Sequence, residues 1–386
     1  MITKPTALTK LMKRCALIAL LSVSAFAAHA GVLPEDRADI LYHVYSGDGI
    51  TAKGPAIFAR KKFGESIDAT ATYDIDSVTG ASIDVRTSGA SPLKGIRKEW
   101  SSGVSYLRGK TTYNVNYLNS TENDYISKNT SFSISEDMFG DLTTVTLGFT
   151  RGWDDISENQ LPKIVPVGTA DRRDYRLGLS QIITKNFIVG LNYDSTALDG
   201  YLQNPYRSVR YGAPNATPSK QDERYPRTRT SNAIAIDGRY YLPYRASIKG
   251  TYRYYIDSWG VVAHTGELEY VHPIKSSWTI EASARYYTQT HADFYADLFP
   301  FIDAQNFLAR DKVLSTFNDW SIRLGGSWRW NHKLLFVNSS VLSLFVDHIQ
   351  YNYQDFKNGM VGATPSVQPL FAYSANLFAF QVTAHY

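Results

Sequence analysis

Residues 67–76 read IDATATYDID, an unbroken alternation of apolar and polar side chains. Successive side chains of a β-strand point to opposite faces, so this stretch predicts a strand with one apolar and one polar face. The same alternation returns at 112–117, 144–150, 248–257, 278–286 and 320–330. The longest of these stretches match the roughly 9–11 residues of a tilted membrane-crossing strand. A soluble β-sandwich is the alternative, but its second sheet would have to cover every one of these long apolar faces.

The connections between the predicted strands alternate in length. The tight ones are Phe63–Ser66, Gly109–Lys110, Met138–Asp141, Thr184–Asn186, Pro243–Arg245, Pro273–Ser276 and Asn331–Lys333. The long ones are Ser77–Gly95, Asp154–Arg172, Ala197–Arg227, Thr290–Leu314 and Asn352–Leu370, with short outer connections near Glu122 and Trp259. Short turns at one end and long loops at the other are typical of outer-membrane barrels. We therefore predict an all-β fold, an antiparallel up-and-down transmembrane β-barrel of about 16 strands, with about 14 or 18 as alternatives because the pairing before residue 65 is ambiguous.

The N-terminal residues have the features of a signal peptide. Lys4, Lys10, Lys13 and Arg14 precede an apolar run from Cys15 to Ala28, and Ala28-His29-Ala30 fits a signal-peptidase site. The run is shorter than the roughly 20 residues of a spanning helix, which disfavours a signal anchor. We expect residues 1–30 to be removed and residues 31–386 to form the barrel.

Removing that segment changes the charge and the cysteine count. Its four basic residues, taken from the 40 of the whole chain, leave 36 basic and 36 acidic residues. A balanced chain gives no support to nucleic-acid binding. The one cysteine, Cys15, is lost as well, so disulfides and thiolate metal sites are excluded from the mature chain.

The C-terminus resembles the signal that the outer-membrane assembly machinery reads. Phe378, Phe380, Val382, Ala384 and Tyr386 share one face of a final strand that ends on an aromatic residue. We expect the segment Phe378–Tyr386 to be the contact with that machinery, and the protein to lie among the lipids of the outer membrane of a Gram-negative bacterium.

The polar faces of the predicted strands carry charges of both signs. The lumen-lining acids are Asp68, Asp74, Asp76, Glu99, Asp237, Glu267, Glu269 and Glu281, and the bases are Arg239, Lys249, Arg253, Arg285, Arg323 and Arg329. Pairing across the turn near Trp259 places Lys249 opposite Glu269. Such side chains tune solute selectivity in a water-filled pore. Alternatively, they only satisfy one another in a wet or plugged interior.

Two outer loops combine charge with aromatic residues. One carries Arg207, Arg210, Arg224, Arg227 and Arg229, and the other, from His291 to Lys312, carries Asp293, Asp297, Asp303 and Asp311 among Phe294, Tyr295, Phe299, Phe301 and Phe307. Burying each ring is worth about 1.5–3 kcal/mol, so we expect the loops to fold together over or into the mouth. They would form a constriction or a ligand platform, or else a packed lid without a ligand.

No catalytic, metal or cofactor site emerges from the sequence. The acidic pair Asp154-Asp155 and the residues His264, His348 and His385 have no spacing that ties them into an active site. We expect a protein that is not an enzyme and that has no cofactor of its own.

Several strings resemble a family of Gram-negative envelope proteins catalogued as a domain of unknown function. They are VTGASIDV (78–85), STENDY (120–125), FGDLTT (139–144), LQNPYRSVRY (202–211), YPRTRTSN (225–232), YYLPYRA (240–246), HADFYADLFP (291–300) and NFLARDK (306–312). The resemblance covers nearly all of the mature chain. It implies an outer-membrane barrel without an assigned substrate, in an envelope setting with periplasmic redox or lipoprotein partners.

Three functional interpretations follow. The first is an outer-membrane channel or porin-like transport component for a small solute. The second is a non-conducting barrel that acts as a scaffold for periplasmic redox or lipoprotein components. The third is an outer-membrane enzyme.

Overall fold

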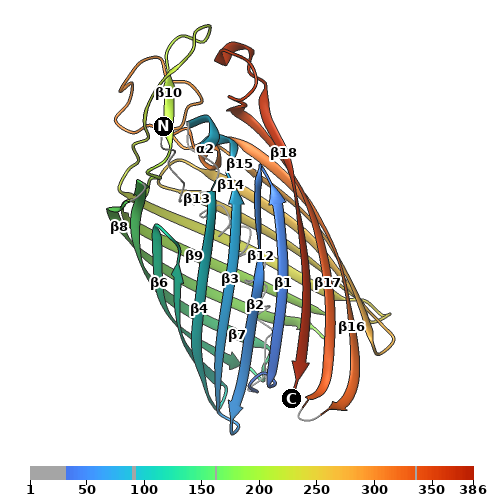
Figure 1. Cartoon of the computed structure of the whole chain (residues 1–386). Coiled ribbons are helices and arrows are strands. Elements are labelled where there is room, and N and C mark those ends of the chain that lie inside the picture. Colours follow the sequence, from blue (N-terminus) through green and yellow to red (C-terminus); the bar gives the residue numbers. More distant parts are fainter. Residues whose placement is uncertain (1–31, 89–92, 161–162, 335–336) are drawn as a thin grey trace.

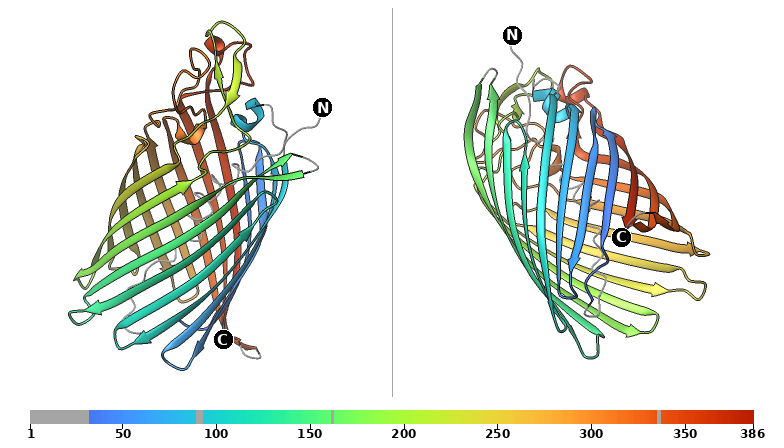
Figure 2. Two further views of the ribbon diagram at one scale, coloured as in Figure 1. Left: turned by 90° about the vertical axis from the view of Figure 1, so that its left-hand side faces the viewer. Right: turned by 60° about the horizontal axis from the view of Figure 1, so that its bottom comes forward.

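The computed structural model describes residues 32–88, 93–160, 163–334 and 337–386, so the predicted signal peptide at 1–30 lies outside the described residues. Within the described ranges, sixteen antiparallel strands close into one barrel (Figures 1 and 2). Their order around the wall is β1-β18-β17-β16-β15-β14-β13-β12-β9-β8-β7-β6-β5-β4-β3-β2. The predicted fold class and strand number are confirmed.

The wall consists of strands that pair with their neighbours in the chain, apart from the closing pair. Their bounds are β1 Arg37–Gly47, β2 Ile50–Phe63, β3 Ile67–Gly80, β4 Leu93–Arg108, β5 Thr111–Thr121, β6 Tyr125–Met138, β7 Thr143–Gln160, β8 Lys163–Thr184, β9 Phe187–Gly200, β12 Thr228–Tyr241, β13 Ser247–Asp257, β14 Val262–Ile274, β15 Trp278–Gln289, β16 Phe317–Leu334, β17 Val337–Lys357 and β18 Leu370–His385. Outside the wall lie the hairpin β10 (Ser208–Tyr211) and β11 (Ser219–Asp222), α2 (Ile83–Ser88), and the short 3-10 turns Lys312–Leu314 and Pro365–Val367.

The alternation that predicted the strands separates an apolar exterior from a polar interior. Leu324 and Leu268 point outward with 61% and 57% of their surface exposed, whereas Asp68 and Asp74 point inward with 1% and 2% exposed. Lipid cannot satisfy backbone polar groups, so strands cross a membrane only when the sheet closes. A closed barrel with an apolar exterior is the fold of an outer-membrane protein. No helix in the described part of the chain is long and apolar enough to cross a membrane.

The first strand closes the barrel against the last. β1 pairs with β18 from Arg37↔His385 to Gly47↔Ala375, and it pairs with β2 through the two-residue turn Asp48-Gly49. Both turn residues have positive φ, 50° and 70°, as a tight hairpin turn requires. This resolves the pairing before residue 65.

Several predicted connections are shorter or shifted in the structure. The predicted long loop Asp154–Arg172 is wrong: β7 and β8 continue as a hairpin to Gln160 and Lys163. Beyond the membrane both faces of a hairpin meet water, so its strands need no apolar alternation. β16 likewise runs through the predicted turn Asn331–Lys333 to Leu334, with a shift in register after Asn331. The short outer connections near Glu122 and Trp259 are confirmed.

Candidate functional site

Three long connections gather over one end of the barrel, opposite the C-terminus (Figures 1 and 2). They are residues 201–227, 290–316 and 358–369, and together we call them the lid. Long loops mark the extracellular end of an outer-membrane barrel, so the lid lies over the outer mouth.

The first two connections fold against each other through backbone and charge. Phe299 N–H donates to the Arg210 carbonyl at 2.9 Å, and Arg224 N–H donates to the Leu308 carbonyl at 2.9 Å. Ion pairs then join Arg207 to Asp311, Arg210 to Asp297, and Arg224 to Asp303. The predicted association of the two loops, with complementary charges, is confirmed.

Asp297 is the most connected acid of the lid. It pairs with Arg210 and, at 3.0 Å, with Arg310, and it also accepts the backbone N–H of Lys357 at 3.1 Å. One carboxylate thereby ties all three segments together, because Lys357 ends β17 just before the third segment.

An aromatic cluster forms the dry centre of the lid. Phe294 packs between Tyr225 and Trp259, with ring centroids 5.4 and 5.1 Å away. The predicted burial of aromatic loop residues holds for Phe294, Tyr295 and Phe299, and it is wrong for Phe301 and Phe307, which are 60% and 41% exposed. Phe307 still lies at the margin of the cluster, with its ring centroid 6.4 Å from that of Phe294.

The lid is anchored to the rim on several sides. Tyr206 donates its hydroxyl to Asp124 at 2.7 Å and accepts the N–H of Asn159 at 2.6 Å, which fixes it to the β5–β6 turn and to β7. Burial raises the pKa of that hydroxyl. On the β3–β4 side, Arg310 Nη1 donates to Thr87 Oγ1 at 3.2 Å. Loops held at these points cannot move as free surface segments.

A further anchor joins Lys312 to Asp48 of the β1–β2 turn. The Lys312 side chain is 1% exposed, and its ammonium also lies 5.2 Å from the ring centroid of Tyr373. Burial lowers the pKa of Lys312 to about 7. Asp48 also accepts the backbone N–H of Ile83 at 3.2 Å, which positions α2 beside it.

Three predicted mouth residues lie outside these contacts between the loops. Arg227 is exposed, and Asp293 is exposed beside Trp259, whose carbonyl accepts the Asp293 N–H at 2.8 Å. Arg229 was expected in a loop, which is wrong: it lies in β12, where the strand begins earlier than its polar sequence indicates. It pairs with Asp257 and lies 4.4 Å from the ring centroid of Trp259.

Beneath the lid, the inner face of β1–β4 holds a cluster of charged groups. Asp74 lies directly opposite Glu99, and Asp76 directly opposite Arg97. Arg97 contacts all three acids, at 3.4 Å for Asp74, 2.9 Å for Asp76 and 2.9 Å for Glu99. His43 Nε2 lies 2.7 Å from Asp76 Oδ1. Three predicted lumen acids therefore converge on one arginine.

A glycine lets His43 reach this cluster. His43 is on β1 and Asp76 on β3, so β2 runs between them, and Gly54 of β2 is paired with His43. A Cβ at Gly54 would lie 1.6 Å from the Ile75 carbonyl oxygen, so the backbones of β2 and β3 approach here as no other residue would allow.

Across the lumen, β12–β17 carry a ladder of ion pairs. The predicted register Lys249↔Glu269 is confirmed. The ion pair to Glu269 comes, however, from Arg239 at 3.3 Å. Arg285 pairs with Asp319 at 2.7 Å.

The remaining predicted lumen residues extend this ladder. Glu267 lies opposite Arg285 in register. Arg323 pairs with Asp347 at 2.6 Å, and Arg253 lies 5.6 Å from the ring centroid of Tyr255.

Sequence reasoning missed several of these groups. Asp319 and Asp347 sit on the polar faces of recognised strands, so extending the alternation would have found them. His43 lies in the segment before residue 65, whose pairing was ambiguous, and Arg97 lies just beyond the predicted loop Ser77–Gly95. Nothing in the sequence around Lys312 or Asp48 signals their contact, because it depends on the folded path of the lid.

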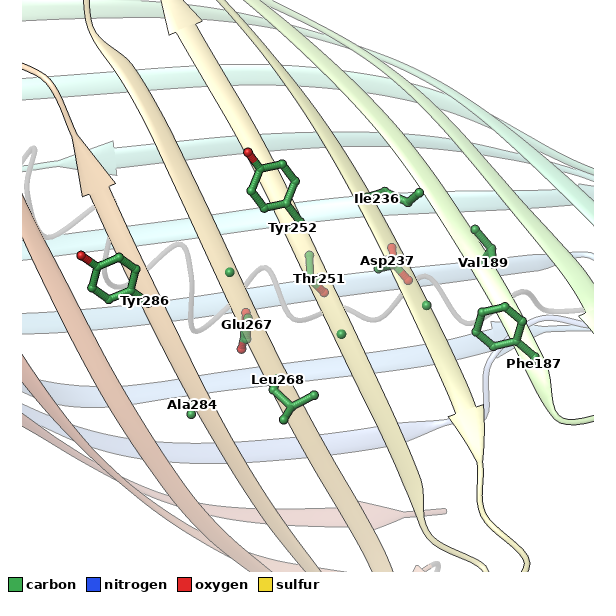
Figure 3. Close-up of a pocket in the computed structure, with 13 residues that line it drawn as sticks. Phe187, Val189, Ile236, Asp237, Thr251, Tyr252, Glu267, Leu268, Ala284 and Tyr286 are labelled. Carbon is green, nitrogen blue, oxygen red and sulfur yellow. The ribbon is translucent and has the colours of Figure 1, made fainter.

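A groove of about 620 Å³ lies on the outside of the barrel, across β9 and β12–β15 (Figure 3). Its lining residues are Phe187, Val189, Ile236, Asp237, Gly238, Gly250, Thr251, Tyr252, Gly266, Glu267, Leu268, Ala284 and Tyr286. Glycines form its floor, and Leu268 and Tyr286 flank it with more than half of their surface exposed. The groove therefore faces lipid rather than the lumen. In the described ranges, no three His, Cys, Asp or Glu residues are grouped as metal ligands would be.

Comparison with known proteins gives one family match. The family described as "Protein of unknown function (DUF3570)" matches residues 158–359. No curated protein matches the chain.

Three similar solved structures have low sequence identity to this chain. One titled "Bacterial polysaccharide outer membrane secretin" has a TM-score of 0.49 and 8% identity, over 93% of this chain and 99% of that one. A Pseudomonas aeruginosa FadL homologue has a TM-score of 0.42 and 10% identity, over 92% and 91% of the chains. The P. putida toluene transporter TodX has a TM-score of 0.43 and 10% identity, over 94% of this chain and 93% of that one.

Proposed function

The chain belongs to the DUF3570 family of proteins of unknown function, and we propose that it is an outer-membrane channel for a small hydrophilic solute, with a mouth narrowed by the lid. The proposal concerns the interior of the barrel. The lipid-facing exterior is common to all proteins of this architecture.

The observation that carries the proposal is the charged inner wall of a wide barrel. Barrels of about 16–18 strands leave an aqueous channel unless something fills them. Here the inner wall carries ion pairs such as Arg285–Asp319 and Arg323–Asp347, with the arginine side chains 36% and 30% exposed. Charged groups at that level of exposure need water beside them, because an isolated charge is costly in a dry interior. A hydrated, charge-lined wall supports passage of polar solutes.

The contacts of the lid support the proposal that the entrance to the channel is narrow rather than open. Its contacts with Asp48, Thr87 and Asp124 hold it to three separate outer turns or loops. A solute would have to pass between the lid and the wall, beside the cluster around Arg97. That position makes the cluster the selective part of the path.

Planar-bilayer recording of the purified full-length barrel tests this proposal. The second sample is a variant in which residues 294–310 are replaced by a short Gly-Ser linker. We expect discrete single-channel currents from the natural chain and larger ones from the variant. Heat-modifiable migration in gels confirms that both are folded. Unchanged conductance in the variant would refute the constriction, and a stable absence of current from both would refute the channel.

A non-conducting scaffold for periplasmic redox or lipoprotein components is the second candidate. It is favoured by the number of buried contacts that fix the lid, since a plugged barrel needs such packing. In the recording above, it corresponds to folded protein without current in either sample. Cross-linking to envelope proteins in cells would then identify the partner.

Export and assembly complete the proposal. We assign residues 1–30 to a cleaved signal peptide, which N-terminal sequencing of the mature protein tests. We also assign recognition by the assembly machinery to the strand Phe378–Tyr386. Phe378 and Phe380 lie on its outward face, 42% and 38% exposed, where a receptor can read them before the barrel closes. Replacing both by Ser should leave the protein soluble in the periplasm or degraded.

A further inference from the structure

Basic side chains face outward on one side of the barrel, at the upper edge of the apolar band. They are Lys98 of β4, Lys128 of β6, Arg151 of β7 and Arg173 of β8, and we call them the basic belt. Residues an even number of positions apart share one face of a strand. Lys98, Arg151 and Arg173 stand two residues from the exposed, outward rings of Trp100, Phe149 and Tyr175. Lys128 stands four residues from the outward ring of Phe132.

Two arginines of the belt lie side by side. Arg151 and Arg173 are directly opposite in the pairing of β7 with β8. Like charges in this position destabilise a sheet unless an anion lies between them. Asp171 contacts Arg151 at 3.2 Å, and the Arg151 guanidinium also lies 5.4 Å from the ring centroid of Trp153.

The other members of the belt carry uncompensated charge. Within the described residues, Lys98, Lys128 and Arg173 take part in no ion pair. Lys128 lies opposite Trp153, which places it beside the two arginines. Three acids, Asp155, Asp171 and Asp199, stand on the outward faces of β7–β9 at this edge, and within the described residues only Asp171 contacts a cation of the belt.

The opposite side of the barrel is different near the same edge. Its outward residues are neutral there, as in the hydrogen-bonded pairs Tyr252–His264 at 2.7 Å and His348–Asn376 at 2.8 Å. Lys53 of β2 is a further exposed outward cation near this edge, but it lies two strands from Lys98, whereas the four members of the belt lie on β4–β8.

We propose that the basic belt binds the phosphate groups of a phosphorylated glycolipid in the outer leaflet. The belt sits directly above the outward rings of Phe132, Phe149 and Tyr175, so a lipid bound by its headgroup would lay its acyl chains against them. Arginine guanidiniums bind phosphate in a bidentate manner, and clustered basic residues at a membrane surface attract anionic lipids. An amphiphile supplies both an anion for Arg173, which takes part in no ion pair within the described residues, and hydrocarbon against the outward rings.

The test uses the full-length barrel in phosphatidylcholine nanodiscs that contain a small fraction of lipid A carrying two phosphates. Native mass spectrometry counts the lipid A molecules that the protein retains. We expect retention by the natural chain and about tenfold or greater weakening in Arg151→Gln/Arg173→Gln. The same lipid A after enzymatic removal of its phosphates should be retained no better than phosphatidylcholine.

Matched variants separate this site from a general charge effect. Lys185 and Lys275 lie in turns at the periplasmic end, so Lys185→Gln/Lys275→Gln removes two charges and should retain lipid A as the natural chain does. Lys98→Gln/Lys128→Gln tests the belt should the arginine variant fail to fold. Equal retention of the dephosphorylated lipid, an equal loss in the periplasmic control, or displacement of lipid A by inorganic phosphate would each overturn the proposal.

Discussion

Lys312 and Asp48 form an ion pair between the lid and the β1–β2 turn, although they are 264 residues apart in the chain. Their side chains are 1% and 3% exposed, so neither charge is stabilised by bulk water. A buried pair of this kind adds little stability over an apolar pair, but breaking it is costly because the remaining charge stays buried. The pair therefore makes the seating of the lid sensitive to the loss of either partner.

At pH 6, where Lys312 is protonated, we expect Asp48→Asn to loosen the lid by about 3–5 kcal/mol, because it leaves the buried ammonium without its counter-charge. Chymotrypsin cleavage at the lid aromatics, followed on the folded barrel, measures the loosening. Asp48→Asn/Lys312→Met removes both charges and should restore most of the protection. Equal cleavage of the single variant and the natural chain would contradict the prediction.

The lid should also close more firmly as the pH rises above about 7. The pKa of Lys312 is about 7 when buried, against an ordinary value of 10.5 when the lid opens to water. Between these values the open state binds more protons than the closed state, so closure gains with pH, by up to about tenfold in its equilibrium constant per pH unit. Below pH 7 both states are protonated and this contribution is flat. Protease protection measured from pH 6 to 10 checks the slope, which Lys312→Met should abolish.

Most of the fold could be predicted from the alternation of apolar and polar side chains along each strand. Side chains such as Tyr73 and Asp74 differ in polarity because one faces lipid and the other faces the lumen, so the sequence itself records the two sides of the wall. The short turns then predicted which strands pair with each other, and that pairing predicted which residues lie opposite one another, such as Lys249 and Glu269. The prediction failed where neither constraint acts, as in the β7–β8 hairpin that extends beyond the membrane.

The site was only partly predictable for a related reason. Asp297 could be identified as a charged loop residue, but its contacts with Arg210 and Arg310 depend on the folded path of two loops. No period or spacing encodes such a path. The charge complementarity of the loops was visible, whereas the pairing of individual residues was not.

Two glycines in strands of the barrel wall, Gly54 and Gly250, should respond very differently to replacement by Ala. At Gly54 a Cβ would meet the Ile75 carbonyl oxygen at 1.6 Å, whereas at Gly250, on the lipid-facing side, nothing lies within 4 Å. Gly54→Ala forces β2 away from β3 and should cost about 1–3 kcal/mol or prevent folding. Gly250→Ala should be nearly neutral. Urea unfolding followed by heat-modifiable gel migration compares them, and equal midpoints would contradict the close approach of the two strands.

Neutralising a carboxylate below the lid should shift the ion preference of the channel. Glu99 faces the lumen and contacts Arg97 at 2.9 Å, so Glu99→Gln leaves more of the arginine charge uncompensated. Fields from charged side chains at a constriction select between ions, and a more positive cluster should lower the preference for cations. Reversal potentials in a KCl gradient, recorded with the lid-shortened variant, measure the change. Glu136 of β6 is exposed on the outward face near the periplasmic end, so Glu136→Gln removes the same charge outside the lumen and should leave the reversal potential unaltered. If both variants shift it equally, the cluster around Arg97 does not line the conducting path.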